Sequence, residues 1–209
     1  VCDGFIGNRI LAHWRPIVDM MVEDGAAPEE VDAALEEFGF AMGPFAVGDL
    51  AGLDIGWARR KRLAQMPATN ARYASTIADE LCVLGRCGQK SGAGWYDYSS
   101  GKKRVDPVVN ELIEEVRTKK HCVRREFTRE AIQKLWRASI INEGAKILND
   151  GIARRPLDID VVLIDGYGYP AWRGGTMFEA DAIGLTKVLA DIEEAHAYAG
   201  AGYEPTALI

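Results

Sequence analysis

Cysteine and histidine are scarce in this chain, and neither follows the spacing of a metal site. The four cysteines contain no CxxC pair, and the three histidines lie far from them along the sequence. Because a structural zinc site uses closely spaced pairs of such ligands, we expect no bound metal. So few cysteines in 209 residues indicate reduced thiols in a cytosol-like compartment rather than a disulfide framework. The residues concerned are Cys2, Cys82, Cys87, Cys122, His13, His121 and His196.

Long apolar runs and one-sided positive charge are also lacking. No apolar stretch approaches the roughly 18 to 20 residues that cross a bilayer, and no signal-peptide pattern opens the chain. The formal net charge is −6, and the basic residues are scattered apart from short clusters at residues 59–62, 102–104 and 119–125. A nucleic-acid-binding surface would concentrate positive charge on one face. We therefore expect a soluble, intracellular protein with no nucleic-acid partner and no membrane span.

The remaining composition is that of a folded protein, because 48% of the residues are hydrophobic and 27% are charged. Val1 stands where an initiator methionine would be, and a helical pattern begins almost at once. We therefore expect the chain to be an excised piece of a longer protein.

Hydrophobic periodicity predicts consecutive helices at the start of the chain. Apolar residues recur at helical spacing over residues 5–23, and Gly25 is a suitable C-cap. Pro28 then suits the first position of a second helix, and the acidic residues after it complement the positive helix start. The stretch 39–45 breaks this helix, and a third passes through residues 49–53.

The same order recurs about 130 residues later, from a helix over residues 128–148 onward. We therefore predict two repeats, residues 1–104 and 105–209, with the boundary after a glycine-rich stretch, and a further helix starting at Asp106-Pro107. Strand patterns are almost absent, so the predicted fold class is all-α. The matching segments are 23–25 with 149–151, 31–35 with 159–163, and 49–53 with 181–185.

Two glycine-rich stretches look like nucleotide-binding loops. Residues 166–171 fit GxGxxA, but Pro170 and two glycines follow where a helix should open, and the repeat predicts helix for the run before them. Residues 85–91 contain Gly, Lys and Ser, but Gln89 separates the glycine from the lysine that must follow it directly in a phosphate loop. We interpret both stretches as turns.

Asn8 and His13 are the polar side chains of interest on the first helix. Five residues of helix place them roughly 140° apart, so they cannot share one site, and His13 is interpreted as a partly exposed structural histidine. Asn8 needs a hydrogen-bond partner if it is buried. The spacing alone leaves two interpretations of Asn8 open, a packing amide or a functional one.

Three ordered motifs closely resemble the C-terminal domain of L-3-hydroxyacyl-CoA dehydrogenases. They are Gly4-Phe5-Ile6-Gly7-Asn8-Arg9, then Phe40-Ala41-Met42-Gly43-Pro44-Phe45 with Asp49 and Gly52-Leu53-Asp54, then Lys90-Ser91-Gly92-Ala93-Gly94-Trp95-Tyr96. The second, degenerate repeat resembles the tail of multifunctional fatty-acid β-oxidation enzymes, so the resemblance covers essentially the whole chain. Family members often carry proline where this chain has Ala41.

The resemblance implies a parent with an enoyl-CoA hydratase part and a Rossmann domain that binds NAD and carries the catalytic His and Glu. This chain alone is then inactive and binds no cofactor. By the same resemblance, Asn8 is the active-site Asn that helps to hold the substrate, and Met42 and Pro44 are walls of the acyl pocket. The aligned position in the second repeat is Lys134, so that repeat is expected to be structural.

The implied partners are the acyl-CoA substrate, the missing Rossmann domain and a possible thiolase subunit, in the cytoplasm or, in a eukaryote, the peroxisome. The two repeats are expected to pack around a pseudo-twofold axis, as paired domains do in dimeric members of the family. Two other functions are possible interpretations of the sequence. A non-catalytic helical interaction module of the same fold fits the second repeat, and a stand-alone short-chain hydroxybutyryl-CoA enzyme is disfavoured because it needs only one repeat.

Overall fold

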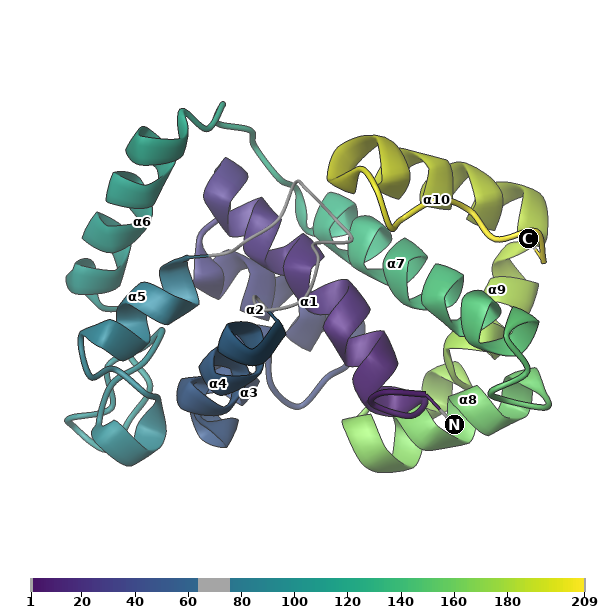
Figure 1. The fold of residues 1–209 in the computed structure, drawn as a ribbon, viewed down its shortest axis with the longest axis horizontal. Helices are drawn as coiled ribbons and strands as arrows, with labels where there is room; N and C mark the ends of the chain where they lie inside the picture. Colours follow the sequence, from purple (N-terminus) through teal and green to yellow (C-terminus); the bar gives the residue numbers. More distant parts are fainter. Residues whose placement is uncertain (1, 64–75, 209) are drawn as a thin grey trace. The chain divides into compact units, whose positions relative to one another are not determined.

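The computed structural model describes residues 2–63 and 76–208, and in this part of the chain the fold is all-α (Figure 1). The described residues contain no β-strand, only isolated bridges that pair Gly88 with Ala93, Ala93 with Asp97, and Asp97 with Arg104. The predicted fold class is therefore confirmed. The α-helices are α1 Gly7–Asp24, α2 Pro28–Phe38, α3 Pro44–Ala51, α4 Leu53–Leu63, α5 Ile77–Val83, α6 Pro107–Lys120, α7 Arg129–Asn149, α8 Pro156–Tyr167, α9 Thr176–Ile183 and α10 Leu185–Ala199, with 3-10 helices at Gln89–Ser91 and Ala171–Arg173.

Proline marks the start of several helices, including those predicted at Pro28 and Pro107. The helices α2, α3, α6 and α8 each begin at a proline, which lacks an N–H that would be unpaired there in any case. Asp106 caps α6 by accepting a hydrogen bond from the backbone N–H of Val108. The predicted helix start at Asp106-Pro107 is therefore confirmed.

Contacts between residues divide the chain into two compact units that differ from the two predicted repeats. The first unit comprises Val1–Val18, Glu37–Ala41 and Glu130–Ile209, and the second comprises Asp19–Glu36 and Met42–Arg129. We call them the α7–α10 unit and the α3–α6 unit. The division at residues 104 and 105 stays a prediction about the sequence repeat, whereas the compact units divide the chain within α1 and α2.

The α7–α10 unit has an aromatic core. Phe38 lies edge-on to Trp136, with ring centroids 5.0 Å apart, and Phe40 and Tyr169 pack around the same indole. The Arg173 guanidinium covers the Phe38 ring and donates to the Phe38 carbonyl. The short segment between α2 and α3 therefore belongs to this unit through its aromatic side chains, which burial and ring stacking hold in place.

The α3–α6 unit is organised around two buried carboxylates. Asp32 on α2 accepts hydrogen bonds from the backbone N–H groups of Phe45 and Ala46, at 2.8 and 3.0 Å, and from the Tyr96 hydroxyl at 2.7 Å. Asp49 on α3 accepts from the N–H groups of Trp95 and Tyr96. Tyr96 thus links the two carboxylates, which bind the glycine-rich stretch to α2 and α3.

Close backbone approach explains the glycines in this stretch. A Cβ on Gly94 would lie 2.0 Å from Oδ1 of Asp49, and one on Gly88 would lie 2.2 Å from the Asp49 carbonyl oxygen. Such contacts leave no room for a side chain, so glycine is required at both positions.

The capping arrangement of Asp32 is repeated by Asp160 on α8. Asp160 accepts hydrogen bonds from the backbone N–H groups of Met177 and Phe178 at the start of α9. Gly43 and Gly175 precede the two capped helices, and a Cβ at either would come within 2.3 Å of the capping aspartate. The predicted duplication is therefore visible in the local geometry of each repeat.

The second repeat lacks the counterpart of the Asp49 interaction. Asp181 matches Asp49 in the repeat, but it is exposed, whereas Asp49 is fully buried. No glycine-rich stretch equivalent to that around Gly94 follows α9, because α10 begins directly after Gly184. The second repeat has kept the helix-capping aspartate and lost the second buried carboxylate.

We predict that Asp32→Ala lowers the free energy of unfolding by about 3 kcal/mol or more, because two buried N–H groups and a phenol lose their acceptor. Asp160→Ala should cost about 2 kcal/mol, since it leaves two backbone donors unpaired. Urea denaturation measures both. Asp165→Ala, at an exposed position of α8, is the matched control, and a loss no larger than in this control would contradict the capping role of either aspartate.

Candidate functional site

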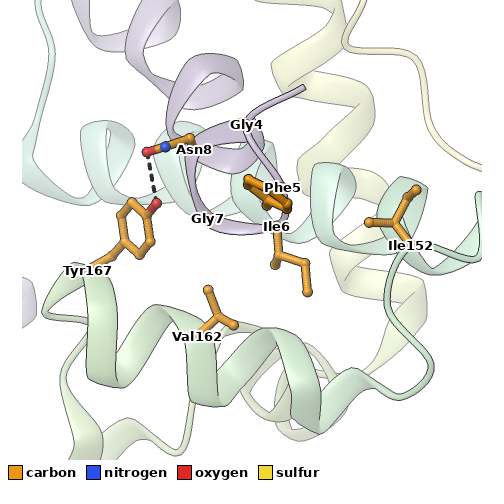
Figure 2. Close-up of a pocket in the computed structure, with 8 residues that line it drawn as sticks. All are labelled: Gly4, Phe5, Ile6, Gly7, Asn8, Ile152, Val162 and Tyr167. Carbon is orange, nitrogen blue, oxygen red and sulfur yellow. Dashed lines mark hydrogen bonds between the residues drawn. The ribbon is translucent and has the colours of Figure 1, made fainter. Parts of the chain in front are cut away.

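Asn8 lies in the first turn of α1, at the edge of a pocket in the α7–α10 unit (Figure 2). Its side chain is exposed, and its carboxamide Oδ1 accepts a hydrogen bond of 2.8 Å from the hydroxyl of Tyr167, the last residue of α8. The two residues are 159 positions apart in the chain. One end of the Asn8 amide is therefore held by the second repeat.

A tight turn before α1 sets the position of Asn8. Gly4 has a φ of 80° and Phe5 a φ of 52°, in the left-handed region that a bulky side chain rarely adopts. Backbone bonds close the turn, from Phe5 N–H to the Cys2 carbonyl and from Asn8 N–H to the Gly4 carbonyl. The turn leaves the Phe5 ring 67% exposed.

Gly7, the first residue of α1, brings Tyr167 close to the helix. A Cβ on Gly7 would lie 2.0 Å from Cε2 of the Tyr167 ring. The absence of a side chain at Gly7 therefore lets the ring lie against the α1 backbone, which places the phenol within hydrogen-bonding distance of the next residue, Asn8.

The pocket has a volume of about 330 Å³ and a mainly apolar wall. Figure 2 shows the side chains of Ile6, Val162 and Ile152 facing one space, with Asn8 and Tyr167 at one side of it. Such a pocket can hold an apolar group while a carboxamide hydrogen-bonds a polar atom at its edge. The lining residues are Gly4, Phe5, Ile6, Gly7, Asn8, Ile152, Val162 and Tyr167.

Met42 and Pro44, which the family resemblance named as walls of the acyl pocket, are not among these lining residues. They belong to the α3–α6 unit, whereas Asn8 belongs to the other unit. Pro44 is the buried first residue of α3, and Met42 is half-buried. The structure therefore does not bring them together with Asn8 within one unit, and their contact with substrate stays a prediction.

His13 lies one turn further along α1, in a largely buried ionic cluster. Arg9 pairs with Glu143, and its guanidinium also lies 2.9 Å from Asp150. Nδ1 of His13 lies 3.3 Å from Glu143, and its ring packs on Tyr203 with centroids 4.4 Å apart. Burial, together with the nearby positive charges of Lys146 and Arg9, lowers the pKa of His13 to about 3. The imidazole is therefore neutral near pH 7 and serves packing, in line with its structural interpretation.

Lys134, the position in the second repeat that aligns with Asn8, forms an ion pair of 2.7 Å with Glu194. The pair links α7 to α10 on a partly exposed surface. A lysine engaged in this way offers no counterpart to the Asn8 amide.

The two glycine-rich stretches adopt conformations unlike those of phosphate-binding loops. The run before residue 166 is helical and forms part of α8, and Gly168 ends that helix with a φ of 70°. In the other stretch the Ser91 hydroxyl donates within its own turn and also accepts from the Cys87 N–H. The interpretation of residues 85–91 as a turn is confirmed, whereas residues 166–171 comprise the last two residues of α8, a short connection and the first residue of a 3-10 helix.

The described residues contain no group of three or more His, Cys, Asp or Glu side chains placed to hold a metal ion. Among their helices, none has both the length and the apolar composition of a membrane span.

Tyr167 is the site residue that sequence analysis missed. In the sequence Tyr167 is part of the GxGxxA-like stretch, in which the glycines are the residues that define the motif. The repeat gives no signal for it, because the offset that matches residues 31–35 with 159–163 places Tyr167 opposite Gly39. Phe38, the last residue of α2, is buried, whereas Tyr167, the last residue of α8, lies at the pocket.

The chain is similar to known proteins over nearly all of its length. The C-terminal domain of 3-hydroxyacyl-CoA dehydrogenase matches residues 4–98. The peroxisomal bifunctional enzymes of Cavia porcellus and Homo sapiens are 44% and 43% identical to it, in each case over 92% of this chain and 28% of the relative. The fatty acid oxidation complex subunit alpha of Pseudomonas aeruginosa is 32% identical over 99% of this chain and 29% of that subunit. The chain thus spans less than a third of these relatives.

Two solved structures share the fold. The dehydrogenase part of multifunctional enzyme 1 from C. elegans superposes with a TM-score of 0.75 at 23% identity, over 99% of this chain and 47% of that chain. The 3-hydroxybutyryl-CoA dehydrogenase of Escherichia coli gives a TM-score of 0.69 at 22% identity, over 98% of this chain and 58% of that chain. At these identities the likeness concerns the fold alone.

We predict that His13→Gln reduces the loss of stability on acidification. Below pH 6.5 His13 takes up a proton in the unfolded chain but stays neutral in the folded one, so its contribution is present above 6.5 and is lost as the pH falls toward 3. Between about pH 7.5 and about pH 5 the wild type should lose up to about 2 kcal/mol that the variant retains. Urea denaturation at both pH values measures this.

His121→Asn, an exchange of an exposed histidine at a left-handed position that Asn tolerates, is the control for this experiment. Equal acid sensitivity of His13→Gln and the wild type would contradict a neutral, buried His13.

Proposed function

Because residues 4–98 of this chain belong to the 3-hydroxyacyl-CoA dehydrogenase C-terminal domain family, we propose that the chain is the helical substrate-binding region of a multifunctional fatty-acid β-oxidation enzyme. In this proposal the reaction oxidises the 3-hydroxyl of an acyl-CoA, and the chain supplies the surface that receives the acyl group. The motifs at residues 4–9, 40–54 and 90–96 lie within the matched segment, so the resemblance found in the sequence is confirmed.

The single observation that carries the proposal is the position of Asn8 beside an apolar pocket. The Tyr167 hydroxyl donates a hydrogen bond to Oδ1 of Asn8, and the Nδ2 group of Asn8 remains as a donor. An acyl group combines an apolar chain with oxygen atoms at one end. In the proposed complex the chain lies against Ile6, Ile152 and Val162, and Nδ2 donates to an oxygen of the 3-hydroxyacyl group.

NAD does not fit the described residues of this chain. The stretch that resembles a dinucleotide loop is the end of α8, and the turn around Ser91 is closed by its own hydrogen bonds. We propose that NAD, the catalytic base and its carboxylate partner belong to a Rossmann domain elsewhere in a longer protein. The share of the relatives that this chain spans, 28% to 29%, leaves room for such a domain and for a hydratase part.

The relatives suggest the setting of the proposed enzyme. Two are named as peroxisomal bifunctional enzymes, which supports a peroxisomal location if the source is a eukaryote. A bacterial relative is named as a subunit of a fatty acid oxidation complex, which supports an enzyme with a partner subunit. We propose that this partner is a thiolase and that a bacterial enzyme of this kind works in the cytoplasm. The acyl-CoA substrate and the Rossmann domain remain the partners that the chain itself needs.

A non-catalytic role is the second candidate, and one observation favours it for the second repeat. Lys134 stands where Asn8 stands in the first repeat, and it is engaged with Glu194. The second repeat therefore carries no amide of its own at the equivalent position, and its direct contribution to the pocket comes from Ile152, Val162 and Tyr167.

We predict that Asn8→Ala in the full-length protein lowers dehydrogenase turnover by roughly 10²- to 10³-fold, the usual loss for one donor aimed at a reacting oxygen. Hydratase activity and the melting temperature should stay unchanged, because Asn8 is exposed. Lys134→Ala is the matched control and should leave turnover unchanged. Steady-state kinetics and thermal melts on the same preparations separate the two effects.

Unchanged turnover per folded molecule in Asn8→Ala would remove Asn8 from the active site and with it the observation on which the proposed function rests. A fall in melting temperature with turnover per folded molecule preserved would make Asn8 a structural amide.

We predict that the 209-residue chain alone binds no NADH in the micromolar range, because neither glycine-rich stretch forms a phosphate cradle. Isothermal titration calorimetry with NADH is the measurement. Micromolar binding that Gly168→Ala abolishes would show that the stretch at the end of α8 is a dinucleotide site after all.

A further inference from the structure

We propose that Tyr167, a residue of the second repeat, is a positioning residue for Asn8, whose carboxamide it holds so that Nδ2 is presented to the substrate. This inference rests on the proposed function. It assigns to the degenerate repeat a direct part in the dehydrogenase site, whereas the sequence led us to expect a purely structural role for that repeat.

The first argument is the hydrogen bond itself. An exposed carboxamide rotates, and each half-turn exchanges its acceptor and its donor. A phenol donates more strongly than it accepts, because its oxygen lone pair is delocalised into the ring. The 2.8 Å bond from the Tyr167 hydroxyl to Oδ1 therefore favours one orientation of the Asn8 amide, with Nδ2 as the remaining donor. Figure 2 shows the phenol and the amide pointing toward each other at the side of the pocket.

The second argument is that neighbouring residues fix the position of the Tyr167 side chain. Its ring occupies the space that a Cβ on Gly7 would need. Its backbone is fixed by the following residues, because Gly168 ends α8 in a left-handed conformation and the Tyr169 N–H donates to the Leu163 carbonyl. Tyr169 is itself buried, and its hydroxyl donates to Glu179. The end of α8 is therefore anchored on both sides of the phenol.

The protonation state of the phenol supports its role as a donor. Burial of part of the ring raises the pKa of Tyr167 above its usual value of 10.0. The hydroxyl thus keeps its proton throughout the neutral range, and the bond to Asn8 does not depend on pH there.

The third argument is the contrast between the two repeats. Phe38 ends α2 as Tyr167 ends α8, but Phe38 lacks a hydroxyl and is buried in the aromatic core. In the second repeat the last residue of α8, one position beyond the register match of Phe38, carries a hydroxyl and lies at the pocket beside the amide of the first repeat. One repeat thus supplies the amide and the other supplies the group that orients it.

A double-mutant cycle in the full-length protein tests this role. Tyr167→Phe removes only the hydroxyl, and we expect kcat to fall roughly three- to tenfold, the size of one neutral hydrogen bond, while KM for the acyl-CoA and the melting temperature change little. In the Asn8→Ala background the same exchange should have no further effect on kcat, because a positioning residue acts only through the residue it positions.

Two further variants sharpen the test. Tyr203→Phe removes another hydroxyl that binds α1, through the His13 carbonyl at 2.7 Å, but this hydroxyl does not contact Asn8, so kcat should stay at the wild-type value. Gly7→Ala keeps the phenol but places a Cβ 2.0 Å from its ring. The ring must then swing away, and kcat per folded molecule should fall as it does in Tyr167→Phe.

The outcomes separate this inference from the proposed function. If Asn8→Ala lowers turnover but Tyr167→Phe does not, the positioning role is wrong and the proposed function stands. Additive effects in the double variant would also overturn the positioning role, because Tyr167 would then act on the substrate independently. If Asn8→Ala leaves turnover unchanged, the proposed function itself fails.

Discussion

The structure depends on buried carboxylates that accept hydrogen bonds from the backbone at helix starts and turns. Burial raises the pKa of Asp32 and Asp160, because removing a carboxylate from water penalises its charged form, and the donors around each carboxylate act in the opposite direction. Each of these two aspartates satisfies two N–H groups at the start of a following helix, which have no partner within the helix itself. A side chain on one helix thereby fixes where the next helix begins.

The two repeats differ in how many of these buried carboxylates they contain. In the first repeat, Tyr96 joins Asp32 to Asp49 and brings the glycine-rich stretch against α3. In the second repeat, Asp160 retains its capping bonds, but Asp181 is exposed. The retained carboxylate still caps the start of α9. The second repeat has thus lost much of the family pattern while keeping the geometry that ends α8 beside α1.

This geometry gives the site its two parts. The turn at Gly4 and Phe5 places Asn8 at the start of α1, and the end of α8 places Tyr167 against Gly7. The polar atoms that meet there come from opposite ends of the chain, while the apolar wall comes from both repeats. A duplicated domain can in this way divide one site between its copies, with each copy free to lose what the other supplies.

Local features of the sequence predicted the first two helices, the starts of α2 and α6, and the helix over residues 128–148, whereas the helix predicted through residues 49–53 is divided at Gly52 into α3 and α4. These features are prolines at helix starts, Asp106 as a cap, and apolar residues at helical spacing. Each acts over a few residues, so it can be recognised from the sequence alone. The identity of Asn8 as a site candidate came from motifs that resemble a family. Tertiary structure alone decided that Tyr167 meets Asn8, that His13 is buried beside Arg9 and Glu143, and that Met42 and Pro44 belong to a different compact unit. The first two outcomes depend on contacts between residues more than a hundred positions apart, and periodicity and capping carry no information about which distant side chains will pack together.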